Sequence, residues 1–288
     1  MNFSTIFFIQ IIITLIICIS AVVYDIRNNI VPLPLTYGLL FFGIVSNFVL
    51  SLISTNVNFI LASLISMVIT YVVTYLLWKL KMWGGGDVLL FTAIATVIPS
   101  GVNINFLNIF PHLSVYPFGI TVIINSILIS FPFLIIFFIR LVIKEGTFNN
   151  HPSYLIALLD IGNLRKLIHS TLNKEIPIED LKEGNIVNNF YFDNPYIARL
   201  IRENDGNLEV FKSSDDGVGF YFKSLSAGGI TEKDMYLIKI LSEQNFIGTK
   251  ISVKVSYPFT PAILGGLMIA LFFGDIMMIF TKNLFMVI

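Results

Sequence analysis

Long runs of apolar residues, separated by short polar stretches, fill the first half of the chain and return near its end. A helix that spans a membrane needs roughly 20 mainly apolar residues. The first run has no positively charged stretch ahead of it, so we expect a retained spanning helix rather than a cleaved signal peptide. The pattern predicts an α-helical polytopic membrane protein. Six transmembrane helices are expected, at about 3–23, 35–53, 59–78, 88–99, 117–143 and 260–280.

The apolar pattern is interrupted before the last of these runs, at residues 144–257. This segment predicts helices near 153–171 and 231–245, the second opened by Thr231 with Asp234 three residues later, in the manner of a capping box. Short strands joined in part through a turn-rich stretch are expected at 208–212, 218–223 and 250–256. We therefore expect a small α+β insert between the fifth and sixth helices, which divides the chain into 1–143, 144–257 and 258–288.

The composition supports a membrane protein. The chain has 288 residues, of which 56% are hydrophobic and 12% charged, whereas a soluble domain has about 25% charged residues. Residues 144–257 carry 13 basic and 15 acidic side chains. Neither part of the chain has the basic excess that a nucleic-acid partner would require. The single cysteine, Cys18, excludes disulfides and thiolate metal centres.

The distribution of basic residues predicts the orientation. Short loops rich in Lys and Arg stay in the cytoplasm. In residues 1–144 the basic side chains lie at or after the ends of the first, third and fifth predicted helices: Arg27, Lys79, Lys81, Arg140 and Lys144. Of all 18 basic residues only Lys282 falls on the other side. We therefore expect a multi-pass cell-membrane protein with its N-terminus outside and the 144–257 insert in the cytoplasm.

Three acids lie within the predicted membrane part, namely Asp25, Asp87 and Asp275. Ionisable residues at membrane depth are costly and mark candidate functional sites. The predicted topology places Asp25 and Asp87 at the cytoplasmic ends of their helices, where they can meet. Asp275 lies some 15 residues into the last run, a climb of roughly 20 Å, so we expect it near the outer face. We expect a structural role for it, either capping a helix or pairing with Lys282.

Two carboxyl groups that share a site cannot both ionise cheaply, so one keeps a proton. Such a pair can activate a water molecule and protonate a leaving group, as in an aspartic protease. A purely structural reading of each acid is also open. Asp25 could pair with Arg27 or Lys81, and Asp87 could cap the helix that follows it.

The glycines before Asp87 strengthen the functional reading. Gly84, Gly85, Gly86 and Asp87 form a G-x-G-D motif directly before an apolar helix. Glycine permits positive φ and close backbone approach, which suits an acid that contacts an extended substrate. The Lys-Ser/Thr continuation of a phosphate-binding loop is absent.

With these residues the chain resembles the membrane-embedded G-x-G-D aspartic peptidases that process type IV prepilins and preflagellins, and most of all their archaeal branch. The resemblance covers essentially the whole membrane part. The matching residues are Asp25-Ile26-Arg27 with Ile30 and Pro32, Gly84 to Asp87 and the helix to Pro99, Tyr116-Pro117 leading to Asn125, and Pro261 through Gly274-Asp275.

The resemblance implies that Asp25 and Asp87 are the catalytic residues of an aspartic-type endopeptidase without a metal or other cofactor. The implied reaction removes the short leader of a prepilin-like or preflagellin precursor at the cytoplasmic face of the bilayer. Many members carry a Lys two residues after the motif Asp, where this chain has Leu89. Lys81 and Arg27 are candidates to replace it. We expect Asn125 to bond between helices.

Two other functions are compatible with the same residues. Asp25 and Asp87 could bind a cation in a small transporter or channel, although transport sites tend to lie near the bilayer midplane. The chain could also cut transmembrane helices inside the bilayer, as presenilin-like G-x-G-D enzymes do. His151 and His169, in the insert, have no metal-ligand spacing, so a metal site is not expected there.

Overall fold

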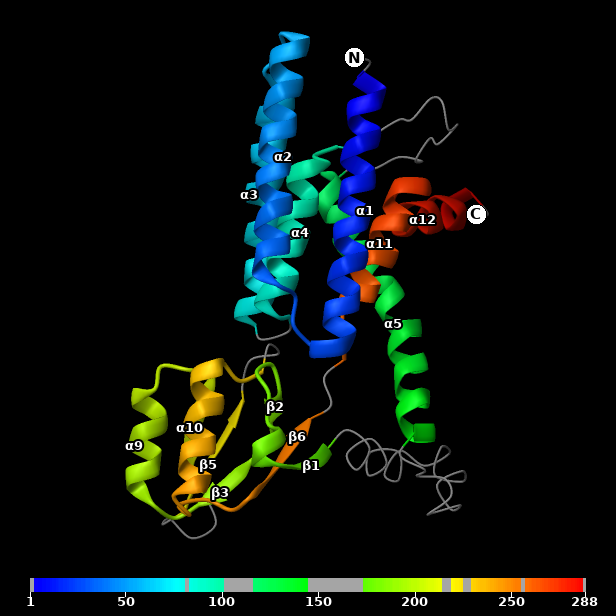
Figure 1. Cartoon of the computed structure of the whole chain (residues 1–288). Helices are drawn as coiled ribbons and strands as arrows, with labels where there is room; N and C mark the ends of the chain where they lie inside the picture. The colour runs from blue at the N-terminus through cyan, green and yellow to red at the C-terminus, as the bar shows by residue number, and fades with distance from the viewer. Residues whose placement is uncertain are drawn as a thin grey trace. The chain divides into compact units, whose positions relative to one another are not determined.

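The computed structural model describes residues 3–80, 83–100, 116–144, 173–213, 219–224, 229–254 and 257–286 (Figure 1). The chain divides into two compact units. Unit 1 comprises residues 1–133 and 258–288, and unit 2 comprises residues 134–257.

Unit 1 is helical. Its elements are α1 (Phe3–Asn28), α2 (Leu33–Ser54), α3 (Asn58–Lys79), α4 (Gly85–Val97), α5 (Phe118–Lys144, which continues into unit 2), α11 (Thr260–Phe272) and α12 (Ile276–Met286).

Among the described residues, four helices are long and apolar enough to cross a membrane: Thr5–Asn28, Leu33–Ser54, Asn58–Lys79 and Phe118–Phe137. The helices α4 and α11 have 13 residues each, a length of about 20 Å at 1.5 Å per residue, against about 30 Å for the hydrocarbon core of a bilayer. The chain is thus a helical membrane protein, but the prediction of six full spans is not confirmed.

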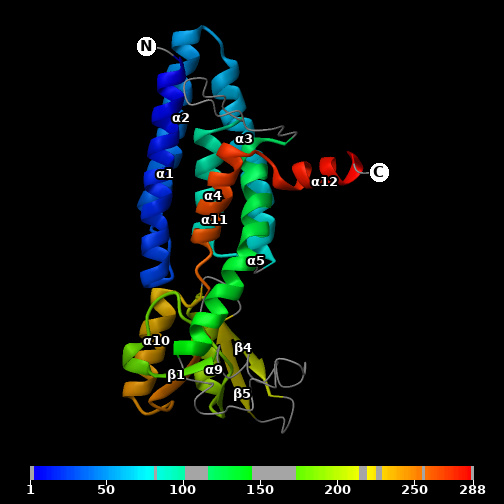
Figure 2. The same ribbon diagram turned by 90° about the vertical axis from the view of Figure 1, so that its right-hand side faces the viewer.

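The last predicted span is two helices rather than one. The helix α11 ends at Phe272, Gly274 adopts a φ of +85°, and α12 begins at Ile276 in a new direction (Figures 1 and 2). Asn125 of α5 joins the two sides of this break. Its Nδ2 donates to the Gly274 carbonyl oxygen at 2.8 Å, and its Oδ1 accepts from the Ile276 N–H at 3.2 Å. Hydropathy misses the break because the run stays apolar on both sides of Gly274 and Asp275. The Asn125 side chain satisfies the backbone groups that the break frees.

The centre of unit 1 is α4, which packs against α1, α2 and α3. Almost every side chain of α4 after Asp87 is buried. The buried side chains of α3 are all hydroxyl-bearing: Ser63, Ser66, Thr70 and Thr74. Small polar residues at helix contacts with apolar side chains outside are typical of membrane bundles, and Ile16, Phe41 and Val68 are accordingly more than half exposed.

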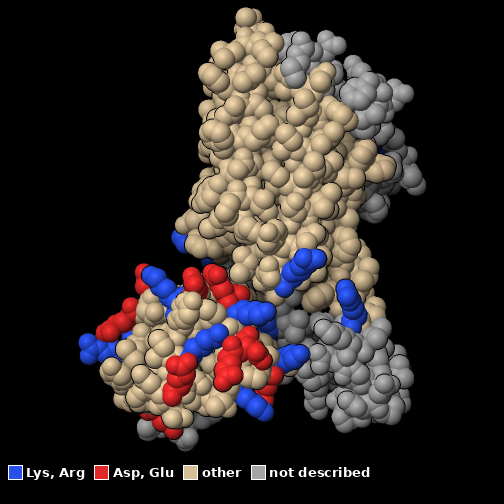
Figure 3. Space-filling view, viewed as in Figure 1, with Lys and Arg blue, Asp and Glu red and all other residues tan. Residues whose placement is uncertain are grey.

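Unit 2 combines two antiparallel sheets with two helices. One sheet has the order β1 (Asn173–Pro177), β6 (Lys250–Lys254), β2 (Ile186–Val187), and the other has the order β3 (Phe190–Phe192), β5 (Phe220–Ser224), β4 (Leu208–Lys212). A 3-10 turn (Ile178–Asp180) and the helices α9 (Pro195–Glu203) and α10 (Glu232–Glu243) complete the described part. The described charges on the face shown in Figure 3 lie mainly on unit 2.

Several predictions for this unit are confirmed. The strands β4 and β5 form the expected pair, β6 lies within the predicted 250–256, and Thr231 opens α10 with a capping box to Asp234. The helix α9 and the strands β1 to β3 were not predicted, because they are short and depend on pairing with distant segments. The helix predicted at 153–171 lies outside the described residues.

Candidate active site

Asp25 lies in the last turn of α1. The helix ends where Asn29 takes a left-handed conformation (φ 56°) and donates its N–H to the Asp25 carbonyl oxygen at 2.8 Å. The side chain of Asp25 is buried, with the residue 7% exposed. Its Oδ2 accepts two hydrogen bonds from Thr260, one from the backbone N–H at 3.1 Å and one from the hydroxyl at 2.8 Å. Thr260 is the first residue of α11, so the last predicted helix supplies the partner that holds Asp25.

Asp87 lies in the first turn of α4. Its Oδ2 accepts the N–H of Gly84 at 3.2 Å, which makes it part of the cap of this helix. The capping role considered for Asp87 from the sequence is therefore present. Capping does not compete with a catalytic role. Only Oδ2 of Asp87 accepts the Gly84 bond, and the Asp87 residue stays partly exposed.

The motif glycines act through size and not through positive φ, contrary to part of the sequence argument. Gly84 has a φ of −76°, and positive φ occurs at other glycines. The close approach is real at Gly86, where an added Cβ would lie 2.8 Å from the Cβ of Val31 in the turn between α1 and α2. The missing side chain thus lets the segment after Asp25 approach the start of α4.

Three aromatic rings hold the start of α4 next to the start of α11. Trp83, just before the motif, stacks on Phe91 of α4 with ring centroids 5.0 Å apart and contacts Phe259 at 5.2 Å. The ring centroids of Phe91 and Phe259 lie 6.4 Å apart, with the two rings tilted at 53°. Because Phe259 directly precedes Thr260, this aromatic cluster brings the residue that holds Asp25 toward Asp87.

The close approach of Gly86 to Val31 and the contact of Trp83 with Phe259 place the end of α1, with Asp25, and the start of α4, with Asp87, in the same region of unit 1. Asp275 serves elsewhere, as its Oδ1 accepts the N–H of Met278 at 3.2 Å in the first turn of α12. Asp275 is fully buried, and the capping role expected for it is confirmed.

Two basic residues were proposed to pair with Asp25, and the structure describes one of them. Arg27 is exposed on α1, and Lys81 lies outside the described residues, as do His151 and His169. Leu89 is partly exposed, two residues after Asp87. Within the described ranges no three His, Cys, Asp or Glu side chains gather as a metal site requires.

Thr260, Trp83 and Phe259 were missed by the sequence argument. A threonine before an apolar helix is a common capping pattern, and only its contact with Asp25, 235 positions away, distinguishes it. The pair Pro258 and Pro261 around it marks the start of a helix and could have drawn attention to this segment.

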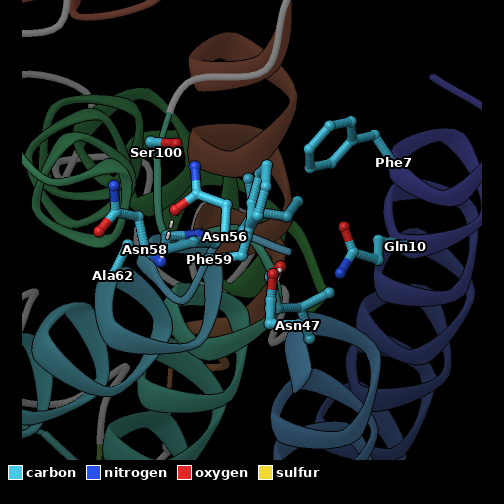
Figure 4. A pocket seen from close by; sticks show the side chains of 11 residues that line it. Phe7, Gln10, Asn47, Asn56, Asn58, Phe59, Ala62 and Ser100 are labelled. Carbon is cyan, nitrogen blue, oxygen red and sulfur yellow. Dashed lines mark hydrogen bonds between the residues drawn. The ribbon is translucent and has the colours of Figure 1, made fainter. Parts of the chain in front are cut away.

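Unit 1 also contains a cavity of about 490 Å³ that neither aspartate lines (Figure 4). It lies beyond the C-terminal end of α4, between α1, α2 and α3. Asn47 of α2 caps that end, since its Nδ2 donates to the carbonyl oxygens of Thr96 at 2.9 Å and Val97 at 3.2 Å. The lining of this cavity is uncharged and includes Phe7, Gln10, Asn56, Asn58 and Ser100.

Comparison with known proteins matches the part of the chain that carries the aspartates. Residues 12–143 match the model of the type IV leader peptidase family. Prepilin peptidase EppA of Methanothermobacter thermautotrophicus is 36% identical over 129 residues, which are 43% of this chain and 34% of that protein. The chain thus spans about a third of the length of this curated relative. The family resemblance drawn from the sequence is confirmed for this segment.

Proposed function

We propose that this chain, whose residues 12–143 match the type IV leader peptidase family, is a membrane-embedded aspartic endopeptidase that removes the leader of type IV pilin-like or preflagellin precursors. The observation that carries the proposal is the close approach of Gly86 to Val31, which places the start of α4, with Asp87, against the turn that follows Asp25, within the matched segment. The presence of a named prepilin peptidase among its relatives supports the substrate class.

The proposed reaction uses one proton shared by the two carboxyl groups. The ionised carboxylate takes a proton from a water molecule as the water oxygen attacks the scissile carbonyl carbon, and the protonated partner donates its proton to the carbonyl oxygen. When the tetrahedral intermediate collapses, the C–N bond breaks and the nitrogen takes the proton that came from water. The hydroxyl proton of the intermediate returns to the other carboxylate, so the pair regains its starting state.

The proposed topology places this chemistry at the cytoplasmic face. Arg27 lies in the last turn of α1 with Asp25, and Lys79 ends α3, in the segment before the start of α4 and Asp87. Basic residues in short loops favour the cytoplasmic side. The 144–257 insert would share this side, between the matched membrane part and the 258–288 segment. A precursor held in the bilayer by its own apolar helix would then present its leader to the aspartates.

The test is cleavage of a pilin-like or preflagellin precursor in membranes that contain the full chain. Asp25→Asn and Asp87→Asn should each abolish processing, since an amide has the shape of the carboxyl group but cannot take or share the proton. Asp275→Asn is the matched control, because Asn also caps helices well, and it should retain processing.

Two outcomes would overturn the proposal. One is a wild-type chain that is present in the membrane but cleaves neither class of precursor. The other is an Asp25→Asn or Asp87→Asn variant that processes as fast as the wild type. Either result would favour the alternative in which Asp25 and Asp87 bind a cation.

A further inference from the structure

Thr260 makes two hydrogen bonds to Asp25 that no sequence pattern predicted. Its hydroxyl and its backbone N–H both donate to Asp25 Oδ2, at 2.8 and 3.1 Å. Thr260 is fully buried, so water does not compete for these bonds.

These donors belong to the start of a helix. Phe259 stands at the N-cap of α11 and offers no side-chain cap, so the carboxylate of Asp25 takes over the role of capping the first N–H groups. A negative charge is stabilised at a helix N-terminus by the helix dipole. The position of α11 is in turn fixed by the contact of Phe259 with Trp83.

The two carboxyl groups are therefore held unequally. Asp87 also lies at a helix start, but the hydrogen bond to it within the described structure is the one from the Gly84 N–H at 3.2 Å, and a hydroxyl donor comparable to Thr260 is not among its described partners. Hydrogen bonds donated to a carboxylate favour its charged form, and bonds to a charged group are stronger than bonds between neutral groups.

We propose that Thr260 is a positioning residue that holds Asp25 as the ionised, water-activating member of the pair, so that Asp87 carries the shared proton. The proposal rests on the proposed peptidase function. With Oδ2 of Asp25 held by Thr260, Oδ1 takes the proton from the attacking water. Asp87 gives its proton to the carbonyl oxygen of the substrate and regains one when the intermediate collapses.

The experiment compares three variants of Thr260 in the full chain. Thr260→Val keeps the shape and the backbone N–H but loses the hydroxyl, and Thr260→Ser keeps the hydroxyl. Thr260→Cys replaces the hydroxyl with a weaker S–H donor. Initial rates of precursor cleavage, measured over a range of precursor concentrations in reconstituted membranes, give kcat and KM separately.

Thr14→Val is the matched control. Thr14 is a fully buried threonine of α1, the helix that carries Asp25, and its hydroxyl donates only to its own helix, at the Gln10 carbonyl oxygen. The amount of folded protein is measured for every variant by thermal unfolding in the same detergent.

We expect Thr260→Val to lower kcat by about ten- to a hundredfold, the effect of removing one hydrogen bond to a charged group. KM should change little, because the fully buried Thr260 acts through Asp25. Thr260→Ser should stay within about threefold of the wild type, Thr260→Cys should fall between the two, and Thr14→Val should match the wild type. If Thr260→Val fails to fold, the order of Ser above Cys still tests the hydroxyl.

The proposal is overturned if Thr260→Val, or Thr260→Cys where Val does not fold, keeps the kcat of Thr260→Ser. It is also overturned if Thr260→Ser loses as much as Thr260→Val, or if the loss appears in KM alone. The failure of the underlying function looks different. In that case the wild type cleaves no precursor, or Asp25→Asn remains active.

Discussion

Gly86 leaves no room for a side chain beside Val31. An added Cβ at Gly86 would lie 2.8 Å from the Cβ of Val31, closer than two carbon atoms can pack. Val31 belongs to the turn that follows Asp25, and Gly86 precedes Asp87. This contact therefore sets how closely the two halves of the carboxyl pair approach, and it gives the third glycine of the motif a steric function.

The contact predicts different effects for neighbouring glycines. Gly86→Ala should destabilise the protein by about 1–3 kcal/mol through overpacking and should lower precursor cleavage at least about tenfold, because small displacements of catalytic groups are costly. Gly85→Ala is the control, since its added Cβ would meet the nearest atom, Trp78 Nε1, at 3.8 Å. Cleavage rates and thermal unfolding of both variants provide the measurement.

A second substitution checks that the contact with Val31 is responsible. Val31→Gly removes the Cβ that Gly86→Ala would meet, so the double variant should lose less than the sum of the two single effects. Purely additive losses would show that Gly86 matters for another reason.

The aromatic cluster predicts that the two tryptophans are not equivalent. Trp83 is 8% exposed and stacks on Phe91, whereas Trp78 of α3 is 40% exposed. Trp83→Ala should cost about 3–5 kcal/mol of stability, as for other large-to-small changes in a core, and should reduce cleavage because α11 and Thr260 lose their support. Trp83→Phe, which keeps an aromatic ring, should retain most of the stability and of the cleavage rate.

Trp78→Ala is the comparison, measured by thermal unfolding and by cleavage in the same membranes. Its effect should be clearly smaller on both. An equal effect of the two alanine substitutions would contradict the role assigned to the stack between Trp83 and Phe91.

The break between α11 and α12 depends on the amide of Asn125. Asn125→Leu has similar volume but leaves the Gly274 carbonyl and the Ile276 N–H without the partners they now have. We expect a loss of about 1–3 kcal/mol for each unsatisfied group and faster hydrogen exchange at the start of α12.

Ser20→Ala serves as the reference for this change, because the Ser20 hydroxyl donates only to its own helix at the Ile16 carbonyl oxygen. It should leave unfolding and exchange nearly unchanged. Hydrogen exchange at α12 as slow in Asn125→Leu as in the wild type would argue that the break is held by other contacts.

The sequence by itself determined the membrane class, the positions of the four long helices and of the two aspartates, and part of the insert. Each of these depends on a local signal. Hydrophobic length marks a spanning helix, and an acid in an apolar region is conspicuous because its burial is costly. The capping box of Thr231 and Asp234 and the β4–β5 pair lie within short stretches of chain, so their residue patterns were sufficient to predict them.

Only the tertiary structure decided which group holds Asp25, why Gly86 is a glycine, and where the last apolar run breaks. Thr260 and Asp25 are 235 positions apart, and Asn125 bonds to Gly274 across 149 positions. Such pairs depend on how helices pack against one another, and mean hydropathy alone does not distinguish one helix from two in the last run. Local patterns predict the elements and the acids they carry, whereas hydrogen bonds and close contacts between distant segments determine the geometry of the site.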